Sequence, residues 1–560
     1  MQHLPMMPSK CNITVGMTYH ADVVVVGAGP AGLQWALLAG QAGIDYVVLE
    51  QAAGPGAFFG RYPRGRRLIS HNKCRSGGRS ADYALRHDWH SLLNASHSMC
   101  TVTADYYPQA QQMVRYLSDI AVGLRVQYQS QVVGLELAPT VRRGAQPRVH
   151  IVRLLGGRTW TCKHLVLATG LQPKPVPAAW AAFGESYSYG DFPALDASHR
   201  APFCDDKEVV VIGTGNAAFE TADLLRGCAS GVHVWGRRPK FSALSHYPGA
   251  LRLQNMGLVD RYLLKSVDSF YARPQSKVMN MTEEMVATAR RELGNVTIFC
   301  GGFTAKRSGL VEDMSEETNG RFPRLGAMYA IPRASNGWYA GSVMHAADYR
   351  QSAGGFVHGF RYLVRAQTRF IFARDFGVRW PAYTVIKPGG RMGAQDAAQL
   401  ALTRVQNSSG LYQMQGRSGL VDVILPTKDA FFFLEEVPRL FVDEVLRVVA
   451  PLELTQRRCE LRFAYGPLEV AEGVAWTFDG GNGPWTFDRL WDTSLEDQKP
   501  SLFLHPVFES VGALKNMGGS EKRKRRVFEA SEDITTTWTG PKFVEEVLDC
   551  AMKCLLAGDE

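Results

Sequence analysis

What this 560-residue sequence lacks limits its function before any motif does. Its ten cysteines include no C-x-x-C pair, and a dithiol couple of the thioredoxin-reductase kind needs two neighbouring thiols. Cys550 and Cys554 lie one helical turn apart and could pair or have no joint role. The first twenty residues contain no apolar core, so no secretory leader is evident. We therefore expect no dithiol relay of the C-x-x-C type.

Long hydrophobic runs are also scarce. Only Val23–Ile44 is uncharged over a length that could cross a bilayer. It divides into four valines, a glycine-rich turn and a segment rich in Ala and Leu, which a strand, a turn and a helix explain better. We expect no transmembrane segment.

The charge balance is only mildly basic. The net charge is +9, and Lys522–Arg526 is the one clear basic run. Such a run can be a nuclear address or a site for polyanions, but it is more often a solvated loop. We expect a loop there and no nucleic-acid partner.

Two regions of the chain share one order of elements: strand, glycine turn, helix, strand. The first consists of Asp22–Val26, Ala31–Gly43 and Tyr46–Leu49, and the second of Glu208–Ile212, Ala217–Leu225 and Val232–Trp235. Such βαβ units predict parallel sheets with right-handed crossovers. After about Phe376 the pattern changes to short strands and Gly/Pro turns, and Trp476–Asp479 recurs at Trp485–Asp488 around a glycine turn, which predicts a hairpin. We expect an α/β core followed by a mixed or β-rich C-terminal domain.

The first unit carries Gly27-Ala28-Gly29-Pro30-Ala31-Gly32 between its strand and helix, and Glu50 ends the next strand. Gly27 makes the tight turn, Gly29 lets a pyrophosphate approach the backbone, and Gly32 lets the helix pack on the strand. The helix N-terminus then stabilises the phosphate charge, and Glu50 accepts hydrogen bonds from the adenosine ribose. Strand, turn, helix and acid agree, so we predict that this unit binds FAD.

The second unit carries Gly213-Thr214-Gly215-Asn216-Ala217-Ala218. Gly236 lies as far from Gly213 as Glu50 lies from Gly27, so a glycine takes the place of the ribose-binding acid, and Arg237-Arg238 follow it directly. Loss of the carboxylate removes repulsion of a 2′-phosphate, which a neighbouring guanidinium can bind with two hydrogen bonds. We predict NADPH rather than NADH here; the alternative is that both arginines are ordinary surface charges.

Several longer segments are more specific than these motifs. Together with the glycine motifs, the strand end Ala168-Thr169-Gly170 is typical of flavin-containing monooxygenase-like proteins. Five segments resemble the FAD-dependent oxidoreductase domain-containing protein 2 family: Arg61–Lys73, Leu85–Trp89, His246–Asp268, Gly341–Asp348 and Ser352–Tyr362. The resemblance extends from about residue 20 to 375, and Leu504–Val507 is a fainter match beyond it.

This resemblance implies a flavoprotein fold with two Rossmann-like dinucleotide units, the NADPH domain being inserted in the FAD domain. Leu165–Gly170 and Thr297–Gly302, two strands that end in glycine, would mark where the chain leaves the FAD domain and returns to it. The FAD-binding domain is expected to comprise two segments, 20–172 and 297–376, with the NADPH-binding domain (173–296) between them and a C-terminal accessory domain (377–560) after them.

The resemblance also implies roles for particular residues. Gly341–Gly359 corresponds to the returning FAD segment, a strand end and a helix whose N-terminus faces the flavin and stabilises negative charge on its reduced ring. Asn72 takes the place of an asparagine beside the flavin, and His345 and Asp348 either touch the ring or cap the helix. The further expected FAD contacts are Gln51, Val132, Ala168, Thr169, Gly170, Gly341, Gly355 and Phe356.

Two activities remain open. In the first, the protein is a monooxygenase-like enzyme that uses FAD, NADPH and O₂ on a soft nucleophile or an amine. In the second, it is a reductase or redox quality-control protein that passes electrons to a small molecule or a protein, with the C-terminal domain binding partners. The Baeyer–Villiger fingerprint is missing, because Phe183–Tyr187, its nearest counterpart, lacks the required His and Trp. We expect an NAD(P)H-dependent flavoprotein oxidoreductase of the monooxygenase-like kind.

The compartment follows from the resemblance and from sequons. The family is luminal in the endoplasmic reticulum (ER) and associated with degradation of misfolded secretory proteins, which implies quality-control partners. The sequence has five N-x-S/T sequons, an excess over chance, at Asn12, Asn94, Asn280, Asn295 and Asn407. Asn94 and Asn407 lie in polar, loop-like segments and are the expected acceptors. The sequons and the family's usual home favour the ER lumen, whereas no leader or K-D-E-L-like ending is evident, so the cytosol is the alternative.

Overall fold

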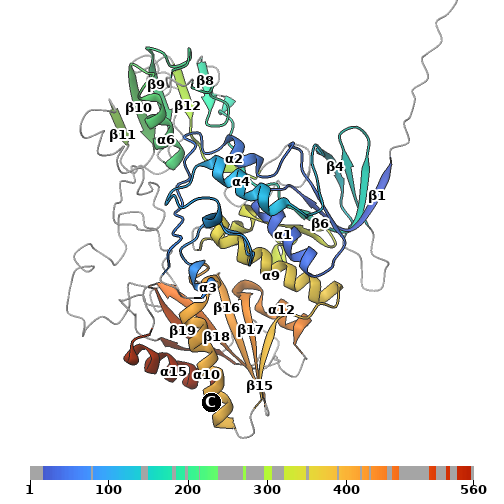
Figure 1. The fold of residues 1–560 in the computed structure, drawn as a ribbon. Coiled ribbons are helices and arrows are strands. Elements are labelled where there is room, and N and C mark those ends of the chain that lie inside the picture. The colour runs from blue at the N-terminus through green and yellow to red at the C-terminus, as the bar shows by residue number, and fades with distance from the viewer. Residues whose placement is uncertain are drawn as a thin grey trace, which may run out of the picture.

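In the computed structural model the described residues of the chain are 17–76, 80–139, 149–178, 185–195, 200–213, 215–236, 269–272, 296–305, 321–347, 352–386, 390–416, 419–427, 430–450, 457–465, 504–512, 525–529 and 539–556. Three large sheets and one two-stranded sheet organise them (Figure 1). The first lies beside the second, and the third lies on the far side of a long helix, α9 (Val357–Asp375).

The first sheet is built around the valine run. Its strand order is β3–β2–β1–β6–β5–β4, with β14 beside β6. The strands are β1 (Thr18–Val26), β2 (Tyr46–Leu49), β3 (Val126–Gln127), β4 (Val132–Glu136), β5 (His150–Leu154), β6 (Thr159–Leu167) and β14 (Gly337–Tyr339). Val23–Val26 are at most 5% exposed because packed residues cover both faces of the sheet. Val23–Ile44 is therefore β1, a turn and α1 (Pro30–Gln41), as predicted.

Three long helices cover one face of this sheet. They are α1, α4 (Ala110–Ala121) and α9. The Trp35 ring of α1 meets the Phe372 ring of α9 edge to face at 5.5 Å. Shorter elements complete this region: α2 (Ala57–Arg61), α3 (Ala81–Ala84), and the 3-10 turns η1 (Met99–Thr101), η3 (Ala327–Tyr329) and η4 (Ser342–Ala346). Among the described residues, no helix combines the length and apolar composition needed to cross a bilayer.

The second sheet is entirely parallel. Its order is β11–β10–β9–β12–β8, and α6 (Asn216–Leu225) follows β9. The strands are β8 (Glu185–Ser188), β9 (Glu208–Ile212), β10 (Gly231–Gly236), β11 (Ser269–Ala272) and β12 (Val296–Phe299). The connections to the first sheet run side by side, because β7 (Gln172–Pro173) pairs antiparallel with β13 (Phe303–Thr304). The second predicted βαβ unit is thus present, on a sheet of its own.

The third sheet is antiparallel, in the order β15–β17–β16–β18–β19–β20. The strands are β15 (Ala382–Ile386), β16 (Leu420–Pro426), β17 (Ala430–Pro438), β18 (Arg458–Tyr465), β19 (Leu504–Val511) and β20 (Arg525–Glu529). The helices around it are α10 (Gly390–Asn407), α11 (Ser409–Gln413), η5 (Arg439–Phe441), α12 (Val442–Val449) and α15 (Pro541–Leu556). This agrees with the predicted mixed C-terminal domain, although α10 and α15 are longer than the sequence pattern suggested.

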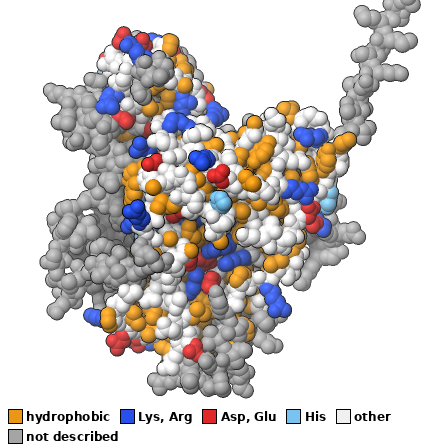
Figure 2. Space-filling view, viewed as in Figure 1, with side chains coloured by type: hydrophobic (Ala, Val, Ile, Leu, Met, Phe, Trp, Pro, Cys, Tyr) orange, Lys and Arg blue, Asp and Glu red, His pale blue; other side chains and the backbone are white. Residues whose placement is uncertain are grey.

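Charged side chains join the third sheet to α9. Arg365 and Arg369 of α9 contact the buried carboxylate of Glu436 on β17, which also pairs with Arg404 of α10. Figure 2 shows side chains of both signs gathered where the third sheet meets the rest of the molecule. These arginines hold the pKa of Glu436 down at about 2, against the opposing effect of burial. The carboxylate therefore stays ionised between two domains.

Two expectations for the C-terminal region are corrected or lie outside the described residues. Arg525 and Arg526 do not lie in a loop: their backbone forms the start of β20, paired with Val511 and Ser510 of β19. A polar run can form an edge strand because its unpaired side faces outward. The predicted hairpin at 476–488 lies outside the described residues.

The cysteines form pairs that the sequence did not suggest. The described residues contain disulfides Cys74–Cys100, Cys204–Cys228 and Cys459–Cys554, while Cys162, Cys300 and Cys550 are buried and take no part in these three pairs. The alternative of a Cys550–Cys554 pair is therefore wrong. Helix α15 packs on β18 and β19, and this turns Cys554 toward Cys459 instead.

Candidate functional site

The turn after β1 is fixed by backbone contacts. The Gly27 N–H donates to the Leu49 carbonyl at 2.8 Å, and Gly27 has φ +105°, a conformation that favours glycine. A Cβ on Gly27 would lie 2.7 Å from the Ala168 carbonyl oxygen, and one on Gly32 would collide with the Gly27 carbonyl. Both glycines are therefore needed for the turn itself.

Gly29 differs from its neighbours. It is the N-cap of α1, Pro30 occupies the first helical position, and a Cβ on Gly29 would meet no atom within 4 Å. The space in front of a helix N-terminus, with its unpaired N–H groups, suits a phosphate. This space would accommodate the pyrophosphate of FAD, and the assignment of Gly27 to Gly32 as its site stays a prediction.

Glu50 lies where a ribose-binding acid is required. Its side chain is 6% exposed, and its carboxylate accepts hydrogen bonds from the backbone N–H groups of Ala28 (2.7 Å) and Ala52 (2.9 Å). The Ser130 N–H donates to the Glu50 carbonyl, which places the start of β4, and hence Val132, beside this strand end. Gln51 follows and is exposed. These contacts orient the carboxylate and leave acceptor capacity for ribose hydroxyls.

The returning segment meets the first motif at this sheet edge. The Ala168 N–H donates to the Val26 carbonyl and the Ala340 N–H to the Leu167 carbonyl, so β1, β6 and β14 end together. Gly341 has φ +87°, and a Cβ there would lie 2.7 Å from the Ala31 Cβ. The structure thus brings the Gly27 turn, Ala168 to Gly170 and Gly341 into one site.

His345, Gly355 and Phe356 lie together at the start of α9. Phe356 is the N-cap of this helix, and a Cβ on Gly355 would lie 3.0 Å from the His345 ring. His345 itself is in η4. Asp348 lies outside the described residues. Whether His345 touches the flavin stays a prediction.

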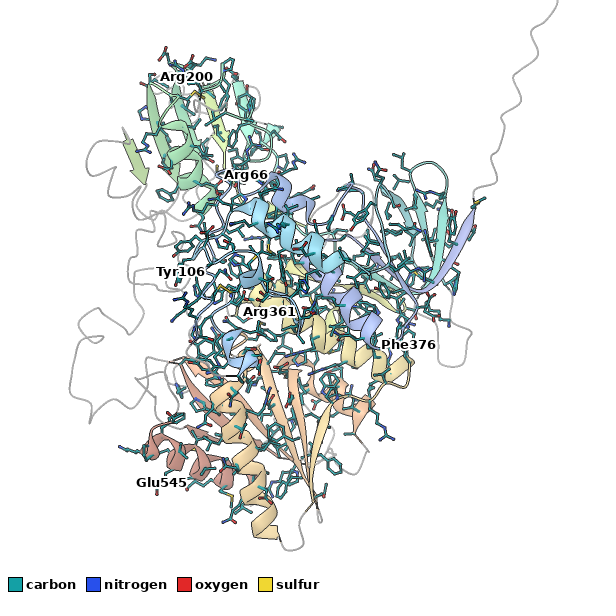
Figure 3. The ribbon with its side chains drawn as sticks, in the orientation of Figure 1. Arg66, Tyr106, Arg200, Arg361, Phe376 and Glu545 are labelled. Carbon is teal, nitrogen blue, oxygen red and sulfur yellow. A yellow bond between two sulfur atoms is a disulfide. The ribbon has the colours of Figure 1, made fainter. Side chains whose placement is uncertain are left out.

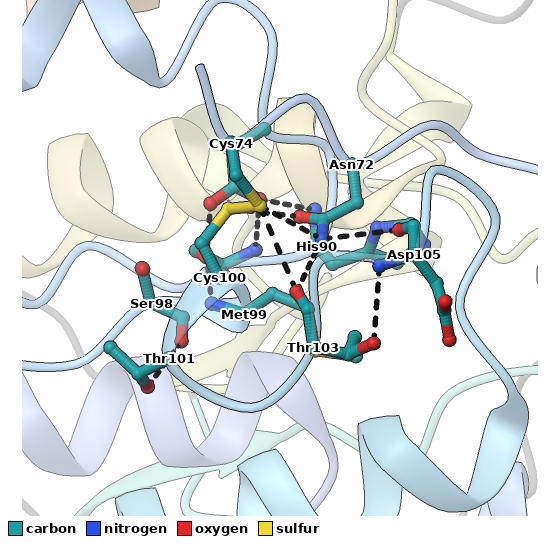
Figure 4. The surroundings of a disulfide bond; sticks show 11 residues. Asn72, Cys74, His90, Ser98, Met99, Cys100, Thr101, Thr103 and Asp105 are labelled. Carbon is teal, nitrogen blue, oxygen red and sulfur yellow. Dashed lines mark hydrogen bonds between the residues drawn. A yellow bond between two sulfur atoms is a disulfide. The ribbon is translucent and has the colours of Figure 1, made fainter.

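Asn72 is held by a loop and by a disulfide (Figure 4). Its side chain is 1% exposed. The Asn72 Nδ2 donates to the carbonyls of Thr103 (3.2 Å) and Asp105 (3.4 Å) and lies 3.4 Å from the Cys74 Sγ. The Asn72 Oδ1 lies 3.6 Å from the Cys100 Sγ. Sequence reasoning missed this disulfide, because nothing local links cysteines 26 positions apart.

A stack of rings leads from Asn72 to α9. The neighbouring His71 ring lies 3.9 Å from the Trp89 ring, and Trp89 stacks on His358 at 4.3 Å. The Arg361 guanidinium of α9 (labelled in Figure 3) donates to the Ser91 carbonyl at 2.6 Å and to the Leu85 carbonyl at 2.8 Å. The segment around Asn72 is therefore packed against the first two turns of α9.

The second glycine motif repeats the first. The Gly213 N–H donates to the Trp235 carbonyl at 2.7 Å, Gly213 has φ +138°, and its Cβ would lie 2.6 Å from the Cys300 carbonyl oxygen. Gly215 is the N-cap of α6, with no atom within 4 Å of its Cβ position. Asn216 begins the helix and Ala218 is fully buried in it. A second dinucleotide pyrophosphate fits in front of α6. Arg237 and Arg238 lie outside the described residues.

One contact between the two units was not predicted. The carboxylate of Glu220, on α6, accepts hydrogen bonds from the Gly65 N–H of the first unit and from the Tyr189 hydroxyl at 3.1 Å. The Arg64 N–H donates to the same hydroxyl at 3.0 Å. Burial raises the pKa of Glu220 to about 7, partly offset by these hydrogen bonds. Sequence spacing could not reveal this contact because Glu220 and Gly65 are 155 positions apart.

Known proteins share these features. The profile of the pyridine nucleotide-disulphide oxidoreductase family matches residues 24–328. The mouse protein FAD-dependent oxidoreductase domain-containing protein 2 is 31% identical over 599 residues, spanning 96% of this chain and 85% of that protein. Its zebrafish (Danio rerio) counterpart is 28% identical with the same coverage.

A solved structure is also similar. The flavin-containing monooxygenase from Stenotrophomonas maltophilia has 19% sequence identity and a TM-score of 0.47, covering 63% of this chain and 99% of that one. The residues matched by the family profile include both glycine turns and the ends of β1, β2 and β6, whereas β14 and Gly341 follow the matched segment. The chain therefore belongs to the pyridine nucleotide-disulphide oxidoreductase family and is an FAD-dependent oxidoreductase of the FAD-dependent oxidoreductase domain-containing protein 2 family.

Proposed function

We propose that this chain oxidises NADPH through bound FAD and acts as a flavin monooxygenase-like enzyme. The observation that carries the proposal is the equivalence of the two turns. Gly27 bonds to Leu49 and Gly213 bonds to Trp235, so the residues that follow these partners, Glu50 and Gly236, occupy the same place. The first unit offers a carboxylate to a ribose, whereas the second offers none, which favours a dinucleotide with a 2′-phosphate.

The residues of the chain would bind and orient the two dinucleotides. Gly29 and Gly215 leave space for the pyrophosphates at the N-termini of α1 and α6. Glu50 would hold the FAD ribose, and the N-terminal end of α9 would stabilise negative charge near the flavin ring. Bound FAD would supply the two-electron chemistry that side chains lack.

Anaerobic reduction tests this function directly. The purified yellow protein is mixed with NADPH or with NADH, and the loss of flavin absorption is followed. We expect reduction by NADPH at a much lower concentration than by NADH. If neither nucleotide bleached the flavin, the second unit would have another role.

Reoxidation by O₂ then separates the two activities. A monooxygenase-like enzyme should consume O₂ in proportion to oxygenated amine or sulfur compound. A reductase should instead return its electrons to an added acceptor and release little oxygenated product. The reductase is the second candidate, and one observation favours it: a disulfide contacts Asn72, the residue predicted to lie beside the flavin.

We also propose that the protein works in the ER lumen, in quality control of secretory proteins. Disulfides persist in oxidising compartments, and the described residues contain three. Asn94 supports the proposal as an acceptor, because it is partly exposed in a polar loop. Asn407 is a poorer acceptor than predicted: it ends α10, donates to the Thr403 carbonyl, and Ser409 of its sequon is fully buried.

Deglycosylation of protein from native tissue tests the compartment. We expect a shift on a gel after treatment, and loss of most of that shift in Asn94→Gln expressed in secretory cells. Asn407→Gln is the matched control and should leave the shift intact. Co-fractionation of the native protein with cytosol, without a shift, would contradict the proposal.

A further inference from the structure

The three disulfides differ in their exposure. Cys204 and Cys228 are at most 4% exposed, and Cys459 and Cys554 are 1% exposed. Cys74, in contrast, is exposed and Cys100 is partly exposed. Exchange begins when a thiolate attacks a sulfur atom in line with the bond, so access decides which disulfide reacts. Among the disulfides of the described residues, only Cys74–Cys100 includes an exposed residue.

The surroundings of this pair suit thiols as well as a disulfide. A disulfide sulfur has no hydrogen, so the Asn72 Oδ1 faces the Cys100 Sγ at 3.6 Å without receiving a hydrogen bond. After reduction the Cys100 thiol can donate to this oxygen. The Asn72 Nδ2, 3.4 Å from the Cys74 Sγ, can donate to that sulfur as a thiolate. One buried amide thus offers an acceptor to one sulfur and a donor to the other.

The backbone of Asn72 and Lys73 connects the pair to α9. Asn72 forms a backbone bridge with Asp88, and the Lys73 N–H donates to the His87 carbonyl at 3.1 Å. Trp89, which follows Asp88, stacks on His358 in the first turn of α9. Loss of the cross-link would free the Cys74 end of this segment, and the segment packs against the start of α9 through Trp89 and His358.

We propose that Cys74–Cys100 is a thiol–disulfide exchange site for a dithiol, and that its opening changes the packing at the flavin-facing end of α9. A thiolate of the incoming dithiol attacks the Cys74 Sγ, and the Cys100 sulfur leaves and takes up a proton. The second thiolate of the dithiol then attacks the dithiol's first sulfur, which is bonded to the Cys74 Sγ, and Cys74 leaves and takes up a proton. The dithiol loses two electrons and becomes a disulfide, while Cys74 and Cys100 become two thiols.

The exchange site depends only on Cys74, Cys100 and Asn72. Its coupling to α9 rests on the proposed FAD site. It differs from a C-x-x-C couple because the fold, rather than the sequence, brings the two sulfurs together. The buried residues Cys162 and Cys300 do not compete, since burial raises the pKa of each thiol to about 12.

The first test measures exchange in the intact flavoprotein. The native protein is incubated with graded dithiothreitol or with glutathione, quenched with acid, alkylated and analysed by mass spectrometry. We expect Cys74 and Cys100 to be alkylated at least tenfold faster than Cys204, Cys228, Cys459 and Cys554, which are internal controls. Dithiothreitol should give two free thiols, whereas glutathione should give a mixed disulfide on Cys74. If the three pairs opened together, the exchange site would be refuted.

The second test measures the coupling to the flavin. The visible spectrum, the fluorescence and the fraction of bound FAD are compared for the oxidised protein, the selectively reduced and alkylated protein, and the double variant Cys74→Ser/Cys100→Ser. The last two should share one altered spectrum and release FAD faster than the oxidised protein. If the double variant does not fold, the alkylated wild type gives the same comparison. Identical spectra and release rates in both states would refute the coupling.

These outcomes are separate from the proposed NADPH reaction. Selective opening of Cys74–Cys100 in a protein that NADPH cannot reduce would support the exchange site and contradict only the proposed function. Reduction of the flavin by NADPH, with all three disulfides equally inert to dithiol, would support the proposed function and contradict the exchange site.

Discussion

The two dinucleotide units of this protein have the same turn but different surroundings. In each, the first glycine abuts the carbonyl of a neighbouring strand end and the second leaves open space at a helix N-terminus. The third position differs: Gly32 allows no Cβ, whereas Ala218 has one and is fully buried. The strand ends differ too, since Glu50 corresponds to Gly236. The two units therefore share the geometry of the turn and differ at the third position and at the strand end.

The largest expected effect comes from the third position. Gly32→Val should destroy the first turn, because its Cβ would collide with the Gly27 carbonyl. We expect loss of bound FAD and a fall of about 3 kcal/mol in the free energy of unfolding, measured by urea denaturation. Ala218→Gly, the reverse change in the second unit, should retain FAD. A yellow Gly32→Val protein of normal stability would remove the proposed distinction between the units.

The open second glycine should separate binding from folding. Gly29→Ala adds a methyl group where no atom lies within 4 Å, so the apoprotein should keep its free energy of unfolding within about 0.5 kcal/mol. The methyl group would occupy the space of the pyrophosphate, so FAD occupancy should fall sharply. Absorbance of the purified protein measures occupancy. Full occupancy would show that the FAD phosphates lie elsewhere.

The strand ends should set the nicotinamide preference. Arg237→Ala with Arg238→Ala should weaken NADPH binding by several kcal/mol, at roughly 1.5–3 kcal/mol for each charged hydrogen bond lost, and leave NADH binding nearly unchanged. Titration calorimetry with both nucleotides measures the difference. Equal losses for NADPH and NADH would point to damage to the fold or to the wrong arginines.

The smallest effect concerns the contact between the units. Because burial raises the pKa of Glu220 from 4.5 to about 7, the folded protein binds a proton here more tightly than the unfolded chain does. Stability should therefore fall as the pH rises from about 4.5 to about 7 and level off above that. Between these pH values the free energy of unfolding should fall by about 2 kcal/mol or less. Glu220→Gln should remove this fall, as measured by denaturation curves at several pH values.

Glu185 provides a control of opposite sign. A hydrogen bond from Tyr187 lowers the pKa of this carboxyl, so its contribution is lost only when the pH falls below the usual range of a glutamate. Glu185→Gln should leave the slope between pH 4.5 and 7 unchanged. If both variants altered that slope equally, the effect would not come from the contact between the units.

The sequence predicted those strands, turns and helices that depend on residues close together in the chain. The valine run, the glycine spacing and Glu50 identified the first unit because strand, turn and helix lie within thirty residues. The position of Gly236 was inferred in the same way. Long-range packing gave no such signal. The resemblance alone predicted that Asn72 lies beside the flavin, and its partners Cys100 and Thr103 come from a loop that no periodicity connects to it.

The antiparallel pair β7 and β13 makes the second sheet an insertion with adjoining ends. Gln172 lies opposite Thr304, so the chain leaves the first sheet and returns to it at nearly the same point. A segment joined in this way can be lost, duplicated or exchanged between genes without altering the distance that the rest of the chain must span. A recombined gene could therefore acquire a different second unit in one step, while the edge of the first sheet, assembled from residues on both sides of the insertion, stays as it was.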